Sequence, residues 1–545
     1  MTNEPVASPS APDVNLADAW EAIAAAVPDA DALIHGETVR SWAQFEERAA
    51  RLAAVFTAAG VGPDAKIAHY MTNGPEYVET TFASFKVRAV PVNVNYRYTA
   101  TELTYLFDNS DAEAVVVSGH LAPRLAEIAG DLPKLKLIVQ LGDEPLIDGA
   151  VGYEAALAAS DPAPPIERSG ADLWFLYTGG TTGMPKGVMW PHASLWGTTA
   201  ASFKGVGEPL PTSATDAGAT AERTHAHSRA PRLLPAPPLM HGTSAIASWG
   251  TLSVGGAIVT LESQSFDPVE LLDVVERRQV TNLTIVGDAF ARPIVETLAA
   301  DQAAGRTRDL SSLSLIVSSG VMWSAATKEA LLAHVDAVMA DLLGSSEAVG
   351  FANSTSKRGR SARTATFRLG PDAAVFTEAG DRVEPGSGVS GVLAVGGPIP
   401  IGYYKDPDKS AGTFRVFEGR NWSVPGDHAL VEADGTITLL GRGSVCINTA
   451  GEKVFPEEVE EALKTHPNVL DANVVGVADE RWGQAVTAVV SLLDGDSFDR
   501  ADLVAHCRST LAGYKVPKRI VVVPSIHRGP NGKADYRWAA AQANA

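Results

Sequence analysis

The chain has 545 residues, of which 45% are hydrophobic and 20% are charged, and its 44 basic and 64 acidic side chains give a net charge of −20. This length exceeds one ordinary hydrophobic core, so we expect a globular protein of at least two domains. The acidic balance disfavours nucleic acid and anionic membrane surfaces as main partners. Cys446 and Cys507 are too few for a disulfide framework or a structural zinc site, and they favour a cytoplasmic location.

The first part of the chain alternates between helical and strand-like patterns. Residues 1–15 lack the basic segment and the apolar core of a signal peptide, so we expect a disordered leader there. Residues 16–60 have a helical pattern of charged and apolar positions. Short apolar runs then follow between helical stretches, at 67–70, 89–94, 114–117 and 137–139. Strands that alternate with helices predict an α/β fold built on parallel-rich sheets.

Two later stretches need separate interpretation. Residues 242–261 carry no charge over twenty positions, but glycine and hydroxyl residues dilute their hydrophobicity. We predict a buried helix followed by the strand 257–261, and no integral membrane segment. Residues 205–232 are rich in Ala, Thr, Pro, Ser and Gly and lack periodicity, so we expect an exposed, mobile insertion in which His225 and His227 bind no metal.

The composition changes after Gly441, where a smaller unit of mixed helices and strands begins. A helix is predicted over 454–464, because Pro456 and acidic residues mark its first turn. The remaining predicted elements are strands at 473–477, 485–493 and 519–523 and a helix at 502–511. This pattern is typical of a compact α+β domain.

A glycine-rich segment, residues 177–187 (YTGGTTGMPKG), follows the apolar run 173–176, which we predict to be a buried strand. Glycines allow backbone N–H groups to turn towards an anion, threonines add hydroxyl donors, and Lys186 supplies a positive charge. The segment lacks the Gly-Lys-Ser/Thr order of a Walker A loop. We therefore predict a phosphate-binding loop of a different type, formed by Thr178, Gly179, Gly180, Thr181, Thr182, Gly183 and Lys186.

This loop closely resembles the phosphate loop of the acyl-adenylate-forming enzymes, and further segments in the family's order extend the resemblance over nearly the whole chain. The resemblance implies an N-terminal adenylating domain (16–441), a hinge (442–444) and a small, mobile C-terminal domain (445–545). Within the family, the segments YTGGTTGMPKGVMW, INTAGEKVFPEEVE and GKADYRW are most similar to fatty-acid and steroid-side-chain CoA ligases.

The resemblance assigns roles to residues of the large domain. His241 in Pro-Leu-Met-His-Gly corresponds to the residue placed against the carboxylate substrate, and the turn at Ser319 and Gly320 to the one that receives adenine. In the segment that follows, Leu343 replaces the family's usual aromatic residue, and Glu347 is implied to bind Mg²⁺. The residues of this segment implied to contact the nucleotide are Gly344, Ser345 and Ser346.

Further roles fall near and beyond the expected hinge. Asp427 is implied to bind the ribose hydroxyls and Arg442 to contact the ribose, while Ser444 stands at the hinge position. The CoA channel is implied to include Gly451, Glu452 and Lys453. Lys533 corresponds to the family's catalytic lysine.

Together, these motifs imply an ATP-dependent carboxylate–CoA ligase that uses ATP, Mg²⁺ and CoA and proceeds through an acyl-adenylate. A bulky hydrophobic acid is expected, since the residues assigned to the acyl wall are apolar: Ala245, Ile246, Trp249, Val286, Phe290 and Met322. Two alternatives stay open, a ligase that delivers acyl groups to a carrier protein and a non-catalytic ATP-binding module. The oligomeric state is not encoded in any motif, and a homodimer is a hypothesis only.

Overall fold

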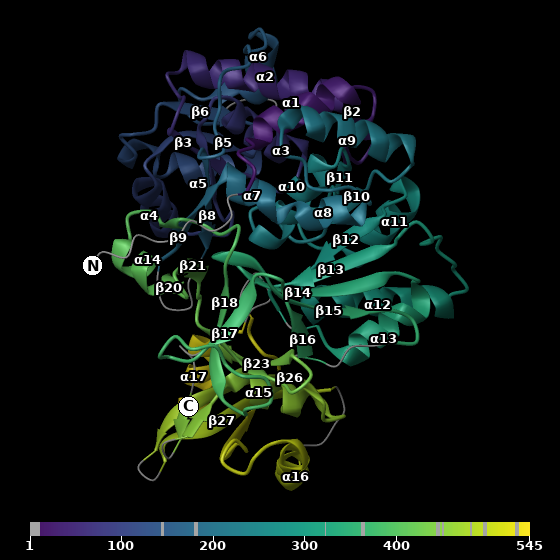
Figure 1. The fold of residues 1–545 in the computed structure, drawn as a ribbon, viewed down its shortest axis with the longest axis vertical. Coiled ribbons are helices and arrows are strands. Elements are labelled where there is room, and N and C mark those ends of the chain that lie inside the picture. The colour runs from purple at the N-terminus through teal and green to yellow at the C-terminus, as the bar shows by residue number, and fades with distance from the viewer. Residues whose placement is uncertain are drawn as a thin grey trace. The chain divides into compact units, whose positions relative to one another are not determined.

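The computed structural model (Figure 1) describes residues 11–142, 146–178, 184–321, 323–360, 364, 366–442, 447–449, 452–479, 482–493, 499–528 and 534–545. The chain divides into two compact units, and each is described by itself. Unit 1 comprises Met1–Thr364 and Val395–Ser423, and unit 2 comprises Ala365–Ala394 and Val424–Ala545.

Unit 1 contains an eight-stranded sheet that carries the glycine-rich hairpin near one edge. In spatial order its strands are β19 (Gly402–Tyr403), β9 (Lys186–Pro191), β8 (Leu173–Thr178), β4 (Val90–Asn93), β3 (Lys66–Tyr70), β5 (Ala112–Val117), β6 (Leu137–Gln140) and β7 (Val151–Gly152). From β8 to β7 neighbouring strands are parallel, whereas β8–β9 and β9–β19 are antiparallel. The mostly parallel sheet agrees with the sequence-based expectation.

A second run of strands in unit 1 is also mainly parallel. Its spatial order is β2 (Thr38–Ser41), β1 (Asp31–His35), β11 (Ala257–Thr260), β10 (Arg232–Pro235), β12 (Asn282–Ile285), β13 (Leu315–Ser319), β14 (Val338–Ser345) and β15 (Ala348–Ser356). Only β1–β2 and β14–β15 pair antiparallel within this run. A separate hairpin of unit 1 joins β20 (Phe414–Phe417) to β21 (Arg420–Ser423). The carboxyl ends of β13 and β14 therefore lie at one edge, where parallel sheets place ligands.

Helices cover these sheets. Those of unit 1 are α1 (Leu16–Ala26), α2 (Trp42–Ala58), α3 (Pro75–Lys86), α4 (Ala100–Ser110), α5 (Ala122–Ala126), α6 (Tyr153–Ala158), α7 (His192–Thr198), α8 (Ala200–Gly205), α9 (Ala214–Ala226), α10 (Gly242–Ser253), α11 (Pro268–Arg278), α12 (Gly287–Ala303), α13 (Ala325–His334) and α14 (Pro407–Thr413). Capping boxes start α2 at Ser41 and α4 at Thr99. Two short 3₁₀ turns complete the set, at Gly119–Leu121 and Ala129–Asp131.

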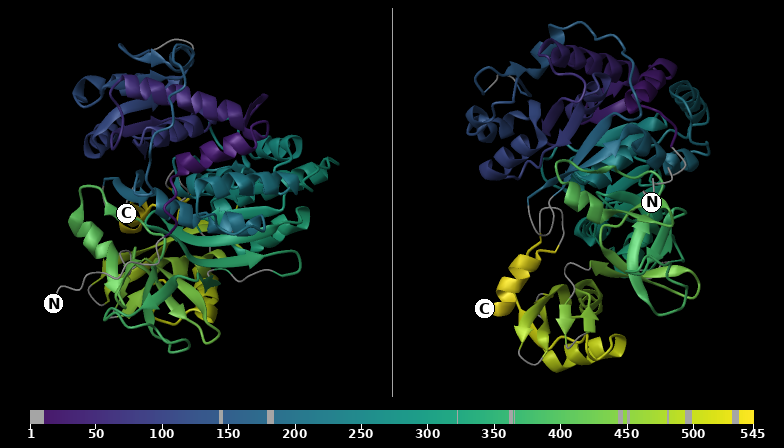
Figure 2. Two further views of the ribbon diagram at one scale, coloured as in Figure 1. Left: turned by 45° about the horizontal axis from the view of Figure 1, so that its top comes forward. Right: turned by 60° about the vertical axis from the view of Figure 1, so that its left-hand side comes forward.

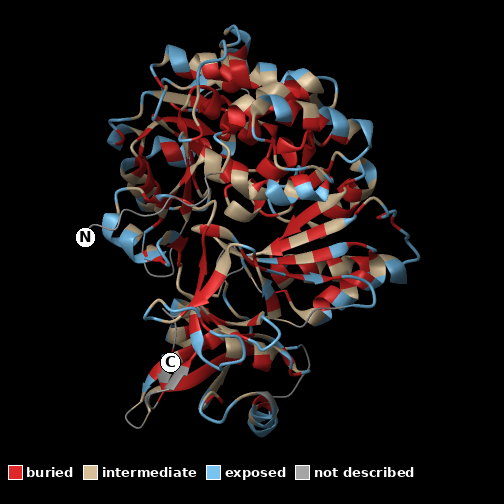
Figure 3. Ribbon diagram, viewed as in Figure 1, coloured by how far each residue is buried: buried red, intermediate tan, exposed pale blue. Residues whose placement is uncertain are grey.

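An aromatic cluster forms the centre of the largest hydrophobic core. The ring of Trp20 lies 5.4 Å from Phe82 and 5.6 Å from Trp249, and Phe45 lies 5.0 Å from Phe82. These residues come from α1, α2, α3 and α10 and are buried, and Figure 3 shows buried segments inside this part of unit 1 with exposed segments on its outer helices. The uncharged stretch 242–261 thus consists of the predicted buried helix and strand. Among the described residues, no helix is both long and apolar enough to cross a bilayer.

The expectation of a helix over 16–60 was only partly right. The structure has two helices there, α1 and α2, and the β1–β2 hairpin separates them. Pro28 follows the end of α1, and Gly36 makes the turn of the hairpin with a φ of +54°. The leader also starts to pack earlier than expected, because Val14 is buried and Asn15 caps α1. Residues 1–10 of the expected leader lie outside the described residues.

The expectation of an exposed, mobile insertion at 205–232 was wrong for its central part. Ser213 caps α9, and the helix buries Ala217 and Ala221 in the core shared with α1. Gly218 of α9 approaches the backbone of Ala22 so closely that an added Cβ would lie 2.8 Å from its carbonyl oxygen. Small residues make this close contact possible. Because they are only weakly hydrophobic, the helix lacks the clear apolar periodicity from which a packed helix is predicted.

The described residues of unit 2 form two groups of strands and three helices. The first group follows the order β16 (Thr366–Leu369), β23 (Thr436–Arg442), β22 (Asp427–Val431) and β18 (Ser390–Val395), and β17 (Ala373–Phe376) also pairs with β18. The second follows the order β25 (Glu452–Val454), β24 (Ile447–Thr449), β27 (Gly483–Leu492) and β26 (Val469–Asp479), with β28 (Arg519–Val522) parallel to β27. The helices are α15 (Pro456–Lys464), α16 (Arg500–Thr510) and α17 (Tyr536–Asn544).

The elements predicted after residue 441 are present in unit 2. The helix expected over 454–464 begins at Pro456, and Val454 belongs to β25 instead. At the end of the chain, α17 lies along the strands of the second group, as the right view of Figure 2 shows, and buries Ala539 against Val475 and Val489. A small α+β C-terminal unit was therefore correctly expected.

Candidate functional site

The glycine-rich segment forms a β-hairpin connection in unit 1. Strands β8 and β9 pair from Leu173–Pro191 up to Thr178–Lys186, so the segment begins and ends on two paired residues. Of the predicted phosphate loop, Gly179–Gly183 lie outside the described residues. Thr178 and Lys186 therefore mark the base of the loop, one on each strand.

Lys186 has an acidic partner that no sequence motif indicated. Its ammonium group forms a hydrogen-bonded ion pair with the carboxylate of Asp406, which also caps α14. The hydrogen bond from Lys186 lowers the pKa of Asp406. The Lys186 Nζ also lies 6.0 Å from the centre of the Tyr403 ring. The loop lysine is thus held by the segment that joins β19 to α14.

The predicted adenine turn and the predicted metal segment are neighbours. Ser319 ends β13 and pairs with Leu342 of β14, while Gly320 follows with a φ of +95°, a conformation that favours glycine. A Cβ placed on Gly344 would lie 3.7 Å from the Ser319 hydroxyl oxygen. The structure therefore brings Ser319, Gly320 and Gly344 together at the carboxyl ends of two parallel strands.

The turn from β14 to β15 carries Ser345, Ser346 and Glu347. The Ser345 hydroxyl accepts a hydrogen bond from the Glu347 N–H at 3.2 Å. The Tyr403 hydroxyl donates to Glu347 Oε1 at 2.8 Å, and the indole Nε1 of Trp190 donates to the Ser346 carbonyl at 3.0 Å. The second oxygen of the half-buried Glu347 carboxylate has no hydrogen-bond partner among the residues that the structure describes. An oxygen with this freedom suits a hard cation such as Mg²⁺.

His241 lies directly before α10, as the half-buried N-cap residue of that helix. Its neighbourhood is joined to the base of the phosphate loop through Asn93. The amide of Asn93 donates to the carbonyls of Tyr177 (2.8 Å) and Met240 (2.7 Å) and accepts from the Tyr177 N–H (2.6 Å). Three bonds from one buried amide therefore fix the residue before Thr178 and the residue before His241.

The expected acyl wall needs correction. Ala245 and Trp249 are buried in the main core, and Trp249 packs against Trp20 at 5.6 Å and Trp174 at 6.5 Å. Both side chains belong to the packed core of this structure. Val286 fits the expectation better, because an added Cβ on Gly320 would lie 3.9 Å from its Cγ1.

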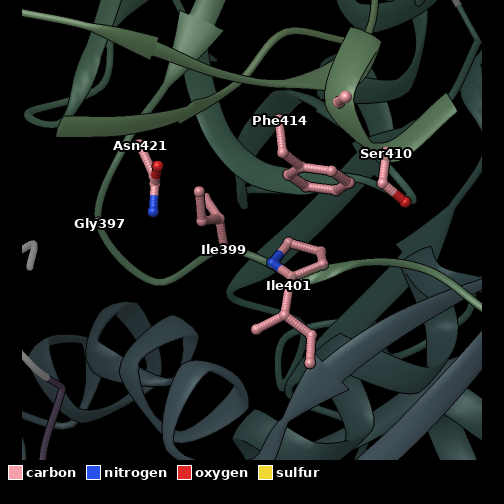
Figure 4. A pocket seen from close by; sticks show the side chains of 8 residues that line it. Gly397, Ile399, Ile401, Ser410, Phe414 and Asn421 are labelled. Atoms are coloured by element: carbon pink, nitrogen blue, oxygen red, sulfur yellow. The ribbon is translucent and has the colours of Figure 1, made fainter. Parts of the chain in front are cut away.

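Two other expected wall residues remain candidates. Ile246 is half-buried, and Phe290 packs against Phe266 with ring centres 4.6 Å apart. Met322 lies outside the described residues. A cavity of about 460 Å³ does occur in unit 1, but no predicted site residue lines it (Figure 4). Its lining consists of Gly397, Ile399, Pro400, Ile401, Ser410, Ala411, Phe414 and Asn421.

In unit 2, the backbones of Asp427 and Arg442 are paired in the register of the antiparallel strands β22 and β23. The predicted ribose contacts are thus brought together by one hairpin. Glu452 and Lys453 lie on β25, where they pair with Thr449 and Asn448. The remaining predicted residues of this part, Ser444, Gly451 and Lys533, lie outside the described residues.

Clusters of possible metal ligands were sought in the parts of the chain that the structure describes. No group of three or more His, Cys, Asp or Glu side chains able to hold a metal ion occurs in the described parts of the chain. His225 and His227 instead bond the carbonyls of Gly255 and Arg223, both at 2.7 Å.

Comparison with known proteins decides the family. The model of the AMP-binding enzymes matches residues 20–404, and the model of their C-terminal domain matches residues 458–533. The chain belongs to the AMP-binding enzyme family. The match to the family's main model ends within the β19–α14 segment, at Tyr404.

Relatives of this AMP-binding enzyme are similar over their full length. It is 42% identical to the medium/long-chain-fatty-acid–CoA/3-oxocholest-4-en-26-oate–CoA ligase of Mycolicibacterium smegmatis, with 96% of each chain covered. It is 41% identical to the 3-oxocholest-4-en-26-oate–CoA ligase of Rhodococcus rhodochrous, with coverage of 96% and 95%. The crystal structure of the anthranilate CoA ligase AuaEII in complex with anthranoyl-AMP has a TM-score of 0.81 at 22% identity, and covers 97% of this chain and 98% of that one. These findings confirm the predicted family, the fold and the class of enzyme, an acyl-CoA ligase.

Sequence reasoning missed four residues of this AMP-binding enzyme that hold the predicted site residues in place. They are Asn93, Trp190, Tyr403 and Asp406. Asn93 lies in the apolar run 89–94, which was predicted to be a strand and was given no role in the site. The other three contact site residues that are distant in sequence, so no local spacing could have revealed them.

Proposed function

We propose that this AMP-binding enzyme is an ATP-dependent ligase that joins CoA to a medium- or long-chain fatty acid or to another bulky hydrophobic acid, such as a steroid side-chain carboxylate. The observation that carries the proposal is the convergence, in unit 1, of the phosphate-loop lysine, the adenine turn and the Glu347 carboxylate. The choice of acid is supported by the names of the relatives with 41–42% identity over nearly the full length.

The reaction divides into two steps because a carboxylate has no good leaving group. In the first step a carboxylate oxygen attacks the α-phosphorus of ATP, a new P–O bond forms, and the bond to the β-phosphate breaks to release pyrophosphate. In the second step the CoA sulfur attacks the acyl carbonyl, and AMP leaves with its phosphate oxygen. Both reactants of the first step are anions, so the site must offset their repulsion before they meet.

Residues of unit 1 fit the needs of the first step. Lys186 and the backbone N–H groups of the loop bind phosphate oxygens, and Ser346 adds a hydroxyl donor. Gly320 leaves room for adenine, while His241 lies near the acid. Glu347 would hold Mg²⁺, which neutralises phosphate charge when it is bound.

The remaining roles belong to the second half of the chain. Asp427 accepts hydrogen bonds from the two ribose hydroxyls, and Arg442 contacts the ribose. Lys533 serves the adenylation step, whereas Gly451, Glu452 and Lys453 serve the thioester step. Ser444 acts as the hinge residue between residues 16–441 and residues 445–545, and the hinge separates the two steps.

The two half-reactions provide the test. Lys533→Ala is expected to lose acyl-AMP formation from ATP and acid, but to convert synthetic acyl-AMP and CoA to thioester at nearly the wild-type rate. An equal loss of both half-reactions would refute the division of roles. A panel of fatty, aromatic and steroidal acids, assayed for AMP release with CoA as the only thiol, identifies the substrate class and excludes a carrier protein as the required acceptor.

The location and assembly of the enzyme are further parts of the proposal. A cytoplasmic location is supported by the low cysteine content, two residues in 545. A homodimer is the proposed assembly, and light scattering of the purified protein tests it directly.

A further inference from the structure

Two hydrogen-bond donors on neighbouring strands converge on one turn of unit 1. Trp190 belongs to β9 and Tyr403 to β19, which pair antiparallel with Tyr403 opposite Val188. Trp190 Nε1 donates to the carbonyl of Ser346, and the Tyr403 hydroxyl donates to the carboxylate of Glu347. The two acceptors are consecutive residues of the β14–β15 turn.

Both donors are rigidly held. Trp190 is fully buried and pairs with Trp174 of β8, and Tyr403 is only 6% exposed. The Tyr403 N–H donates to the Ser410 hydroxyl at 2.8 Å, and its ring meets Phe414 edge-on at 5.9 Å. Buried rings in such surroundings keep one orientation, so the bonds they donate have fixed directions.

One of these two strands, β9, also carries one end of the phosphate loop. Strand β9 begins at Lys186, and Asp406, three positions after Tyr403, holds the ammonium group of Lys186. Strand β9 and the segment from β19 to Asp406 therefore hold the lysine for the phosphates and also contact the turn with the carboxylate for the metal. The hydrogen bonds of Trp190 and Tyr403 link Ser346 and Glu347 to these strands.

We propose that Trp190 and Tyr403 are positioning residues that set the Ser346–Glu347 turn relative to the phosphate loop. Tyr403 occupies Glu347 Oε1 and so presents the other carboxylate oxygen to the metal that accompanies ATP. Trp190 fixes the backbone from which the Ser346 hydroxyl projects. This inference rests on the proposed function, in which Glu347 holds Mg²⁺.

The next residue provides a matched control. The hydroxyl of Tyr404 also donates to a carboxylate, that of Asp111, at 2.7 Å. Asp111 has no role in the proposed site, and Lys134 and Lys405 also pair with it. Tyr404→Phe therefore removes the same kind of bond as Tyr403→Phe, one residue away, without touching Glu347.

Metal binding is measured without catalysis. Mn²⁺ replaces Mg²⁺, and electron paramagnetic resonance follows free Mn²⁺ during titration of each variant with α,β-methylene-ATP present. Loss of a residue that orients a metal ligand lowers metal affinity by a factor on the order of ten. We expect that shift for Tyr403→Phe, a smaller shift of about threefold for Trp190→Phe, where only a carbonyl loses its donor, and none for Tyr404→Phe.

A second measurement separates orientation of the metal ligand from general damage. Binding of metal-free AMP should stay within about twofold of wild type in all three variants, since Asp427 and Gly320 contact the nucleoside in the proposed site. Equal Mn²⁺ affinities of Tyr403→Phe and Tyr404→Phe would overturn the positioning role. The role would also fall if AMP binding dropped as much as Mn²⁺ binding.

A different experimental result would refute the proposed function. If wild-type protein binds neither the nucleotide nor Mn²⁺ in its presence, the proposed function itself fails. If wild type binds both and only the Tyr403 comparison shows no difference, the positioning role alone fails. Should Tyr403→Phe melt far below Tyr404→Phe, Trp190→Phe decides, and an unchanged Mn²⁺ affinity in that variant rejects the proposal.

Discussion

The predicted site residues of the two units are brought together in different ways. In unit 2, Asp427 and Arg442 are paired by the backbone hydrogen bonds of a single hairpin, β22–β23. In unit 1, strand pairing is supplemented at Lys186, Ser346 and Glu347 by side-chain bonds to segments far apart in sequence. Trp190 reaches Ser346 across 156 positions, and Lys186 reaches Asp406 across 220.

This difference has a physical consequence. A hairpin register is set by many backbone bonds, so a single side-chain change leaves it intact. A contact made by one side chain disappears when that side chain is replaced. In unit 1, substitution of a residue that contacts no substrate should therefore displace the predicted site residues. In unit 2, a substitution should remove only the contacts that the replaced side chain makes to the ligand.

The largest effect is expected at Glu347. Glu347→Gln keeps the size and the acceptor for Tyr403 but removes the charge for the metal, so acid-dependent ATP–pyrophosphate exchange should fall about 10²- to 10³-fold. The control is Glu222→Gln, which changes an exposed carboxylate of α9. A loss of less than about threefold at Glu347 would remove this residue from the proposed machinery.

The corresponding test in unit 2 concerns the ribose. Asp427→Asn replaces a double acceptor by an amide, and the KM for ATP should rise about 10- to 100-fold, as expected for loss of hydrogen bonds to a charged group. Wild type should prefer ATP to 2′-deoxy-ATP, and the variant should have lost that preference. A variant that still discriminates between the two nucleotides would show that another residue reads the ribose. Circular dichroism and the melting temperature should stay near wild type, because the hairpin does not depend on the side chain.

Substitution of Asn93 tests directly whether the site of unit 1 depends on a residue that contacts no substrate. Asn93→Ala removes three buried hydrogen bonds and should lower the free energy of unfolding by about 2 kcal/mol, because backbone groups of Tyr177 and Met240 lose their partners. Adenylation should fall as well, although Asn93 contacts no substrate in the proposal. Asn109→Ala is the matched control, since Asn109 only accepts a bond from the Tyr177 hydroxyl, at 2.8 Å. Equal effects of both changes would contradict the role of the Asn93 amide.

The smallest effect concerns the acid stability of unit 1. Burial lowers the pKa of His192 to about 3, below the ordinary 6.5 of an unfolded chain, while the nearby Asp172 and Arg168 act in opposite directions. Between pH 6.5 and 3 the unfolded chain binds a proton at His192 that the folded chain does not bind. The free energy of unfolding therefore keeps its full value, as far as His192 is concerned, above pH 6.5 and decreases as the pH falls towards 3.

His192→Gln removes the titrating imidazole. The dependence of the unfolding free energy on pH should then be less steep, by up to about 1.4 kcal/mol per pH unit between pH 6 and 4. Urea denaturation at several pH values measures the slope. The control is His227→Gln, because His227 is exposed at the end of α9. The same slope in wild type and His192→Gln would show that the histidine is not held neutral.

The fold was predictable where the pattern of side chains is simple. Alternating apolar runs gave the parallel sheets, and Pro456 with its acidic neighbours gave α15. The pattern failed where small residues pack closely, as Gly218 of α9 does against Ala22. It also failed at 16–60, where the short β1–β2 hairpin interrupts a helical pattern and no long apolar run marks it.

Candidate site residues could be predicted where a motif is local in sequence. Ser319, Gly320, Gly344 and Glu347 were predicted from such short motifs, at strand ends and turns, and their roles stay predictions. Tyr403 and Asp406 were not found, because their role depends on the pairing of β19 with β9, which no local signal in either segment reveals. Trp249 was assigned to the acyl wall because no local signal shows that it packs against Trp20 of α1, which is distant in sequence.

The central claim is that a carboxylic acid is activated as an acyl-adenylate. It is tested most directly by following an oxygen-18 label from the acid. Wild-type enzyme is incubated with ATP, CoA and a hydrophobic acid whose carboxylate carries oxygen-18, and the AMP is analysed by mass spectrometry. The account predicts one atom of oxygen-18 in AMP and none in pyrophosphate, because the attacking oxygen stays on the α-phosphorus when CoA displaces the adenylate. Unlabelled AMP, or label in pyrophosphate, would contradict it.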